Sequence, residues 1–329
     1  MTWLVAGAAR ATIGTRAKQE DAFEIWPSGA QAATRSGEGL LAVVADGMGG
    51  HAGGEVAGKL ACETFVNSFT HTETGASERL KSALDAGNAA IAAHVAENAK
   101  LRGMGCTLVA AWIDRTGLRW VSVGDSLLLL FRAPQVLRLN ADHSLGAFLD
   151  DQARRNKISP VEAENNPYRN ALRSALTGKS LEIVDLRNEP YRIAPGDWII
   201  LASDGIGTLE GDEIGDIVYA NRDATPETMA DGLIAAVVAK SLPDQDNTTV
   251  IVLKVSEDET AADEAPTRIL KPEIYGLMGT YRDEGVATTQ RIVHPAAFAS
   301  LFKRHRTAVF GVGMGLMFLI GWLLRAWLE

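Results

Sequence analysis

The chain has 329 residues, 47% of them hydrophobic and 22% charged, so it can form one large globular domain or two smaller ones. Its formal net charge of -9 argues against non-specific binding to nucleic acid, which requires a basic surface. With only two cysteines, Cys62 and Cys106, the sequence has no disulfide framework and favours a reducing compartment.

The N-terminal residues 1–13 are small and apolar, but they lack the basic start and long apolar run of a signal peptide. A charged cluster, residues 15–23, follows them. Such a cluster is often only a solvated loop. However, the Arg16 side chain is well shaped to hold a phosphate through two parallel hydrogen bonds, and Glu20 and Asp21 could bind a metal ion beside it.

Residues 40–57 form the most informative stretch of the chain. The six apolar residues 40–45 predict a buried strand, because a short apolar run ended by turn residues suits one. Asp46 follows at once, then five glycines within eight positions, and glycines let the backbone pass close to a ligand. From Gly54 the apolar spacing predicts a helix. The stretch therefore predicts a carboxylate beside a loop of exposed backbone groups, which is a site for a cation or a phosphate.

The middle of the chain alternates between helix and strand patterns. Ser77 is predicted to cap a helix that ends near Lys100. Strands are predicted over residues 106–113, 118–131 and 136–139. Residues 146–170 are charged and lack a clear apolar period, which favours a flap or a small inserted subdomain.

Three further acids lie beside predicted core strands. Asp125 stands in a Gly-Asp-Ser link between two strands, Asp204 directly follows an apolar run (WIILAS), and Asp246 precedes another (TTVIVLKV). An isolated aspartate at a strand end usually forms a turn or caps a helix. Four of them, with Asp46, indicate a shared site instead, because strand ends can hold side chains rigidly together. Mg²⁺ and Mn²⁺ prefer oxygen ligands of this kind.

The C-terminal third begins like the core and then changes character. Thr225 and Pro226 predict the start of a helix to about Lys240, and the last core strand is predicted to end at Val255. The acidic residues that follow, 256–265, predict a solvated linker.

Residues 307–324 are uncharged and apolar, and 18 residues at about 1.5 Å each span about 27 Å, close to the hydrocarbon thickness of a bilayer. A buried core helix is the alternative, but the segment has no polar face. Basic residues precede the segment, so the positive-inside rule keeps the large domain in the cytoplasm. We expect a single-pass tail anchor in the inner, plasma membrane.

Three phosphate-handling motifs fit only in part. Residues 47–52 match the dinucleotide pattern G-x-G-x-x-A, but no second strand ending in an acid follows at the required distance. Residues 178–180 end like a P-loop, yet Arg173 stands where the first glycine belongs. Residues 244–248 spell the D-x-D-x-T of aspartate-nucleophile phosphatases, but they precede a strand instead of following one.

Taken together, the stronger motifs resemble those of the metal-dependent protein serine/threonine phosphatases, the PPM or type 2C family, in the bacterial form. The resemblance runs from residue 14 to residue 255, with the motifs in the family's order. It rests on Arg16 with Glu20-Asp21, residues 43–57 (VVADGMGGHAGGEVA), Gly105-Cys106-Thr107, Val123-Gly124-Asp125-Ser126, Asp142-His143-Ser144, residues 166–172, Leu201-Ala202-Ser203-Asp204-Gly205 and Asp246-Asn247.

The resemblance implies an α+β fold, a four-layer α-β-β-α sandwich with two central antiparallel sheets flanked by helices. We therefore expect a catalytic domain over residues 1–255, with the flap at about 143–172. A linker and juxtamembrane segment over 256–306 would lead to the transmembrane helix at 307–324.

The resemblance also implies the roles of the site residues. Asp46 would bridge two Mn²⁺ or Mg²⁺ ions, with the Gly47 carbonyl on one of them. Asp204 and Asp246 would bind the other ion, and Glu20 would act through bound water. Asp125 would bind a third, weaker ion together with Asp204. Asp21 and Asn247 would support these ligands, and Arg16 would bind the substrate phosphate. A water shared by the two ions would attack phosphorus, so no protein nucleophile is needed.

Two positions depart from the family pattern. Met48 stands where many eukaryotic members have a histidine proposed as the general acid, and His51 is a weak replacement for it. Gln19 stands where bacterial members usually have asparagine.

The sequence thus predicts a membrane-tethered phosphatase that acts on phosphoserine and phosphothreonine in proteins and opposes a cognate serine/threonine kinase. Two alternatives stay open. One is a catalytically silent scaffold of the same fold, and the other is a membrane-anchored nucleotide-binding protein that uses the glycine loop.

Overall fold

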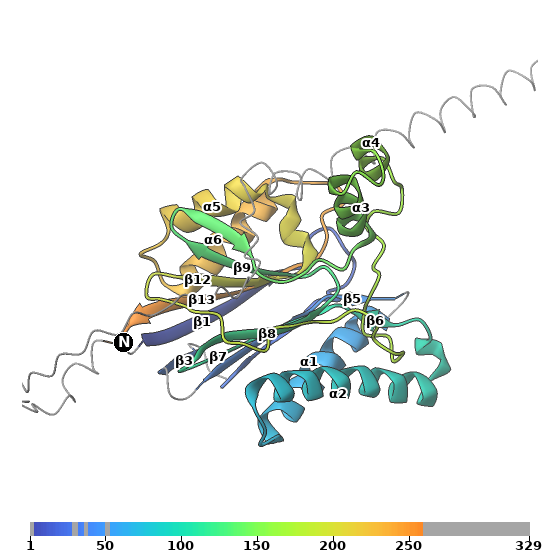
Figure 1. Ribbon diagram of the computed structural model, residues 1–329, viewed down its shortest axis with the longest axis horizontal. Coiled ribbons are helices and arrows are strands. Elements are labelled where there is room, and N and C mark those ends of the chain that lie inside the picture. The colour runs from blue at the N-terminus through green and yellow to red at the C-terminus, as the bar shows by residue number, and fades with distance from the viewer. Residues whose placement is uncertain (1–2, 28–31, 36–38, 50–52, 259–329) are drawn as a thin grey trace, which may run out of the picture.

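The computed structural model describes residues 3–27, 32–35, 39–49 and 53–258. Within these ranges two antiparallel sheets pack face to face, with helices on both outer sides (Figure 1). The predicted membrane segment 307–324 and most of the predicted linker lie outside the described residues. None of the helices described has the length and hydropathy that a membrane span requires.

The first sheet has six strands in the order β10-β9-β12-β13-β1-β3. Their bounds are β1 (Trp3–Thr12), β3 (Ala32–Arg35), β9 (Leu127–Arg132), β10 (Gln135–Arg138), β12 (Trp198–Ala202) and β13 (Thr248–Glu257). The second sheet has the order β11-β8-β7-β4-β2. Its strands are β2 (Ala22–Trp26), β4 (Leu40–Ala45), β7 (Leu108–Asp114), β8 (Gly117–Val123) and β11 (Asp185–Leu186). A short pair, β5 (Gly47–Met48) and β6 (Gly105–Cys106), lies beyond β4.

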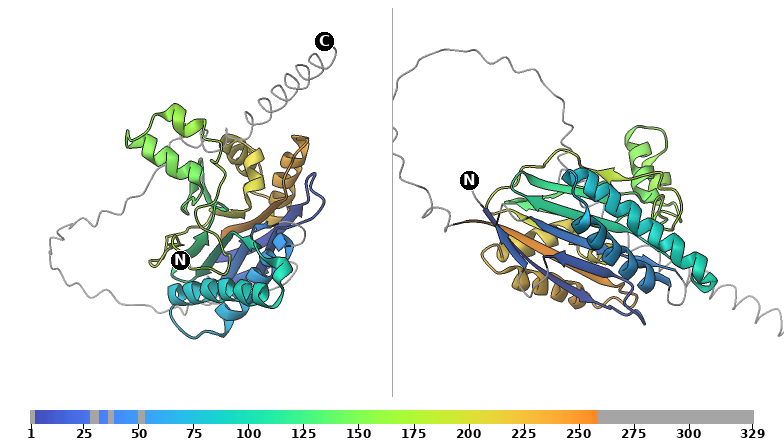
Figure 2. Two further views of the ribbon diagram at one scale, coloured as in Figure 1. Left: turned by 90° about the vertical axis from the view of Figure 1, so that its right-hand side faces the viewer. Right: turned by 90° about the horizontal axis from the view of Figure 1, so that it is seen from below.

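Helices cover both outer faces and one end of this sandwich. Figures 1 and 2 show α1 (Gly53–His71) and α2 (Ala76–Glu97) across the second sheet, and α5 (Gly211–Ala220) and α6 (Pro226–Ala239) across the first. The short helices α3 (Leu145–Arg154) and α4 (Pro160–Glu164) project at one end, within the predicted flap. The described part also contains the 3-10 turns η1 (Ala99–Leu101) and η2 (Asp204–Thr208). The predicted four-layer arrangement of antiparallel sheets and helices is confirmed.

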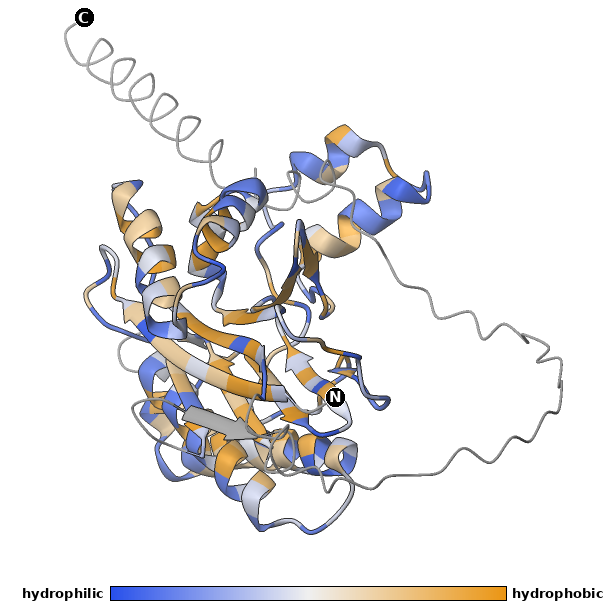
Figure 3. Ribbon diagram, turned by 90° about the vertical axis from the view of Figure 1, so that its left-hand side faces the viewer, coloured by the Kyte–Doolittle hydropathy of each residue, from blue (hydrophilic) through white to orange (hydrophobic). Residues whose placement is uncertain are grey.

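Three hydrophobic layers hold the four layers of backbone together. Strand β4 explains how: Leu41, Val43 and Ala45 face α1 and α2, while the alternate residues face the other sheet. Strand β12 does the same in the first sheet, where Ile199 and Leu201 pack between the sheets and Trp198 packs against α5 and α6. Because both faces of these strands are buried, their sequences are continuous apolar runs, and Figure 3 shows hydrophobic residues concentrated along them.

The structure corrects several local expectations. The predicted cap Ser77 does not cap α2: Gly75 is the N-cap, and the Ser77 hydroxyl donates instead to the Asn188 carbonyl, 2.9 Å away. The predicted strand 106–113 is broken at Thr107, whereas the predicted Gly-Asp-Ser link between two strands is confirmed as the turn 124–126 between β8 and β9. By contrast, the cap predicted for α6 is confirmed, since the Thr225 side chain accepts from the Thr228 amide.

Candidate active site

The strand registers bring the four predicted acids to one end of the sandwich. Ala202 pairs with Leu127 on one side and with Val250 on the other. The end of β12 therefore meets the starts of β9 and β13, which places Asp204 beside Asp125 and Asp246. In the second sheet, Val44 near the end of β4 pairs with Val109, and Val123 at the end of β8 pairs with Leu108. Both strands therefore end beside the start of β7, so Asp46 after β4 lies at the same end as Asp125 after β8.

Asp46 stands at the centre of this cluster. Its backbone is fixed by Thr107, whose hydroxyl accepts from the Asp46 amide at 3.1 Å and whose own amide donates to the Asp46 carbonyl at 2.9 Å. Burial raises the pKa of the Asp46 carboxyl well above its usual range, and the charges of Asp204, Asp21 and Asp125 raise it further. The Asp46 and Asp204 carboxyl groups also share a hydrogen bond, which raises the pKa of Asp46 and lowers that of Asp204.

The neighbouring acids show the same effect. Burial, followed by the charge of Asp246, raises the pKa of Asp204 to about 6. Burial raises the pKa of Asp21 to about 6, against a hydrogen bond from Ser203 that lowers it. Burial and the charge of Asp204 raise the pKa of Asp125 to about 7. Crowding among like charges makes ionisation of the whole set unfavourable.

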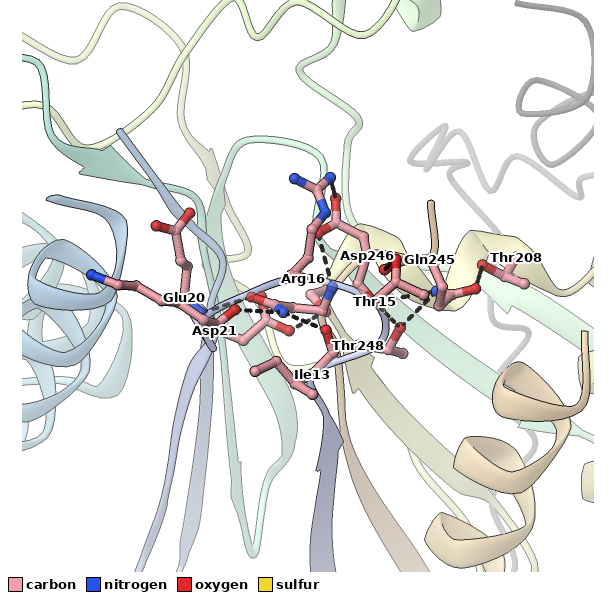
Figure 4. Close-up of polar contacts among 12 residues, drawn as sticks. Ile13, Thr15, Arg16, Glu20, Asp21, Thr208, Gln245, Asp246 and Thr248 are labelled. Carbon is pink, nitrogen blue, oxygen red and sulfur yellow. Dashed lines mark hydrogen bonds and ion pairs between the residues drawn. The ribbon is translucent and has the colours of Figure 1, made fainter. Parts of the chain in front are cut away.

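The loop that carries the first motif is fastened to the start of β13 (Figure 4). The Asn247 side-chain amide donates to the carbonyls of Ile13 and Lys18, and its oxygen accepts from the Glu20 amide at 2.7 Å. Gly14 has a φ of +60°, and a Cβ there would lie 2.4 Å from the Asp246 carbonyl. Asn247 therefore holds the loop that carries Glu20 in position, and its predicted support of the metal ligands stays a prediction.

Glu20 reaches the cluster from the same loop. Its carbonyl accepts from the Gly47 amide at 3.2 Å. A Cβ at Gly47 would lie 2.4 Å from this carbonyl, and one at Gly54 would lie 2.7 Å from the Glu20 carboxyl carbon. The two glycines are thus needed for close approach of the first motif to the second. Gly50 and His51 lie outside the described residues.

Arg16 contacts an acid of the cluster. Its guanidinium donates to Asp246 at 2.6 Å, and the two side chains are 55% and 42% exposed. Figure 4 shows this pair at the edge of the network. Only one guanidinium nitrogen contacts Asp246, so the remaining donors of Arg16 are available for a phosphate.

The two cysteines lie in the core, as expected. Both are buried, and burial raises the pKa of the Cys62 and Cys106 thiols. A raised thiol pKa suppresses the nucleophilic thiolate. Neither cysteine therefore fits the role of a phosphatase nucleophile.

The donor set suits a hard divalent cation, because it consists of carboxylate oxygens beside the Gly47 backbone. Asp21 Oδ1 is buried without a hydrogen-bond partner among the described residues, which leaves one such oxygen available. No three His, Cys, Asp or Glu side chains in the described part converge tightly enough to form a preassembled cage. The acids that the sequence singled out therefore share a neighbourhood, while their individual roles as metal ligands remain predictions.

Two residues of this site escaped the sequence analysis as individuals. Thr107 and Ser203 were noted only as letters within motifs, yet their hydroxyls hold Asp46 and Asp21. Both are small hydroxyl residues beside a motif acid, a signal too common to single them out.

The chain resembles known phosphatases in both sequence and structure. The sequence model of the protein phosphatase 2C family matches residues 13–218, more than half of the chain. Among curated proteins, the chain is 36% identical over 222 residues to the serine/threonine protein phosphatase PstP of Mycobacterium tuberculosis, and the match covers 67% of this chain and 41% of that protein. It is 30% identical over 220 residues to the serine/threonine phosphatase stp of Listeria welshimeri, covering 65% of this chain and 84% of that one.

Solved structures agree in fold. The crystal structure of the M. tuberculosis serine/threonine phosphatase PstP/Ppp has a TM-score of 0.63 at 31% identity, covering 77% of this chain and 100% of that one. A structure of the PstP catalytic domain in complex with two manganese ions has a TM-score of 0.61 at 31% identity, with the same coverage. The match to the mycobacterial sequence spans under half of that relative's length.

Proposed function

Because the chain belongs to the protein phosphatase 2C family, we propose that it hydrolyses phosphoserine and phosphothreonine in proteins, with Mn²⁺ or Mg²⁺ as cofactor. The observation that carries this proposal is the cluster of Asp46, Asp204, Asp21 and Asp125, whose charges act on one another at one end of the sandwich. Such a cluster is costly unless cations neutralise it.

The residues of the chain divide the work of the reaction. Asp46, Asp204 and Asp246 would hold two cations, with Glu20 and the Gly47 carbonyl assisting, and Asp125 would hold a third together with Asp204. A bound pair of such ions supplies an activated water and positive charge opposite the phosphoryl oxygens. Arg16 would bind the substrate phosphate and orient it for in-line attack.

Metal-dependent hydrolysis provides the test. With p-nitrophenyl phosphate and a phosphothreonine peptide, the wild-type chain should be active in Mn²⁺ and inactive in EDTA. Asp46→Asn and Asp204→Asn should each lower kcat at least about 100-fold, because each removes a carboxylate that would hold the cations whose positive charge stabilises the transition state. Asp231→Asn is the matched control, since Asp231 pairs with Arg10 on the surface. Full activity in both cluster variants would refute the proposal.

We also propose that residues 307–324 anchor the protein in the inner membrane with the catalytic domain in the cytoplasm. This rests on the length and composition of the segment and on the basic residues before it. After cell fractionation, the full chain should sediment with membranes and resist extraction by high salt. A chain ending at residue 258 should stay in the supernatant with its activity retained. Recovery of the full chain in the supernatant would exclude the anchor.

The biological partner that we propose is a cognate serine/threonine kinase whose products this enzyme reverses. Cells lacking the protein should accumulate phosphoserine and phosphothreonine on a defined set of proteins, as measured by quantitative phosphoproteomics. Wild-type protein should reverse this and Asp46→Asn should not, while phosphotyrosine serves as an internal control. An unchanged phosphoproteome would contradict the proposal that the enzyme reverses the products of a cognate kinase.

A further inference from the structure

The hydroxyl of Ser203 joins three segments that lie far apart in the sequence. Its Oγ donates to Asp21 Oδ2 at 2.7 Å and accepts from the Thr249 amide at 2.9 Å. The Ser203 amide in turn donates to the Thr249 carbonyl at 3.0 Å. Ser203 is fully buried, so these contacts are made without competition from water.

Each of the three segments carries an acid of the proposed metal site. Ser203 directly precedes Asp204, Asp21 directly follows Glu20, and Thr249 lies three residues after Asp246. One buried hydroxyl therefore connects the segments that carry Asp204, the first motif and Asp246.

Asp21 is the group that this hydroxyl holds in place. Ser203 occupies one carboxylate oxygen, and the other, Oδ1, is buried without a hydrogen-bond partner in the described part of the chain. Thr249 Oγ1 also lacks a partner by hydrogen-bond geometry, although it lies close enough to lower the pKa of Asp21. The charge of Asp21 is felt by both Asp46 and Asp204. The orientation of Asp21 therefore decides where a buried, unsatisfied oxygen lies relative to the acids beside it.

We propose that Ser203 is a positioning residue for the metal site: its hydroxyl fixes the orientation of the Asp21 carboxylate beside the acids of the cluster, and it thereby sets the affinity of the site for cations. The inference rests on the proposed function. A group that orients a ligand or its neighbour without touching the metal commonly changes metal affinity about 10–100-fold when it is removed.

A purely structural role for Ser203, holding β12 against β13, is the alternative. Ser174 provides the matched control, because it is also buried and its hydroxyl donates to a backbone carbonyl, that of Ile183, at 2.8 Å. Ser203→Ala and Ser174→Ala each remove one buried hydroxyl. Only the former removes a contact to an acid of the cluster.

The decisive measurement is the Mn²⁺ affinity of the full chain by isothermal titration calorimetry, with melting temperatures in EDTA recorded in parallel. Ser203→Ala should weaken Mn²⁺ binding about 10–100-fold. Ser174→Ala should bind Mn²⁺ like the wild type even where its melting temperature falls as far. Equal affinity in Ser203→Ala and the wild type would overturn the inference, whereas absence of Mn²⁺ binding in the wild type would overturn the proposed function instead.

A double-mutant cycle tests whether Ser203 acts through Asp21. If it does, Ser203→Ala should add little to the loss of Mn²⁺ affinity already caused by Asp21→Asn. Additive losses would contradict the proposal. Should Ser203→Ala fail to fold, Ser203→Thr, which keeps the hydroxyl, and Ser203→Cys, which replaces it with a weak donor, decide the question. The threonine variant should then bind Mn²⁺ more tightly than the cysteine variant, and the reverse order would refute the role of the hydroxyl.

Discussion

Residues of the site are held by partners that the sequence places far away. Arg16 contacts Asp246, Glu20 is held by Asn247, and Asp46 is held by Thr107. The acids themselves could be identified from their position beside apolar runs. Thr107 could not be, because a threonine near a turn usually satisfies only its local backbone, and Asn247 could be named only through the family resemblance.

Arg16 provides a prediction at the level of a single residue. Arg16→Ala should lower kcat/KM for a phosphopeptide about 10–100-fold, because it removes a charged donor to phosphate that contributes about 1.5–3 kcal/mol. The free energy of unfolding should change by less than about 1 kcal/mol, since the ion pair with Asp246 is exposed.

Steady-state kinetics and urea denaturation in EDTA check both parts. Arg10→Ala, which removes a comparable surface ion pair with Asp231, should leave kcat/KM unchanged. A large loss of stability in Arg16→Ala with unchanged kcat/KM would assign Arg16 a structural role only.

At the level of elements, the close approach of helix α1 to the backbone of the first motif limits the size of the residues that α1 can contain. Helix α1 contains Gly58, where a Cβ would lie 2.9 Å from the Glu20 carbonyl. Helix α2 contains Gly87, where the nearest atom to a Cβ would be the Ala61 carbonyl oxygen at 3.5 Å, an ordinary contact. Both glycines are buried helix residues, and only the structure separates them.

These glycines form a matched pair for mutation. Gly58→Ala should destabilise the protein by about 1–3 kcal/mol through overpacking, and should lower activity because the displaced backbone carries Glu20. Gly87→Ala should stabilise it by about 0.5–1 kcal/mol, because alanine is the better helix former. Chemical denaturation measures both values. Destabilisation of similar size in the two variants would show that the close approach of α1 to the first motif does not limit residue size.

For the molecule as a whole, the acid cluster makes stability depend on pH and on metal. The unfolded aspartates have a pKa near 3.9, whereas burial and like charges raise the folded pKa to about 6 for Asp21 and Asp204 and about 7 for Asp125. Between pH 4 and 7 the folded state therefore binds more protons, and stability from these groups falls as pH rises. His143 opposes part of this trend, because burial lowers its pKa.

The melting temperature in EDTA should accordingly be lower at pH 7.5 than at pH 5. Mn²⁺ should raise it more at pH 7.5, because cation binding requires ionised carboxylates. Differential scanning calorimetry with and without Mn²⁺ checks this, and Asp204→Asn should flatten the pH dependence. A melting temperature in EDTA that rises steadily from pH 5 to pH 7.5 would contradict the assigned shifts.

The N-terminal strand shows where sequence reasoning about the fold reached its end. Residues 3–12 form β1, which pairs with β13 along its whole length, yet their sequence is only small and apolar and does not predict a strand. Alanine and glycine are weak strand formers, so the neighbouring strands decide the outcome. Strands β2 and β3 were missed as well, since they lie at sheet edges and have little of the continuous apolar pattern that identified β4, β12 and β13.

The sequence by itself determined the acids, the glycines beside them and the buried strands that carry both, because short apolar runs ended by Asp-Gly combine a core signal with a turn signal. The tertiary structure alone decided which of these ends meet. Antiparallel pairing in two sheets brings Asp46, Asp125, Asp204 and Asp246 to one end of the sandwich. Buried hydroxyls such as that of Ser203 then hold neighbouring acids in place. Such contacts depend on register between segments up to about two hundred residues apart, which no local pattern encodes.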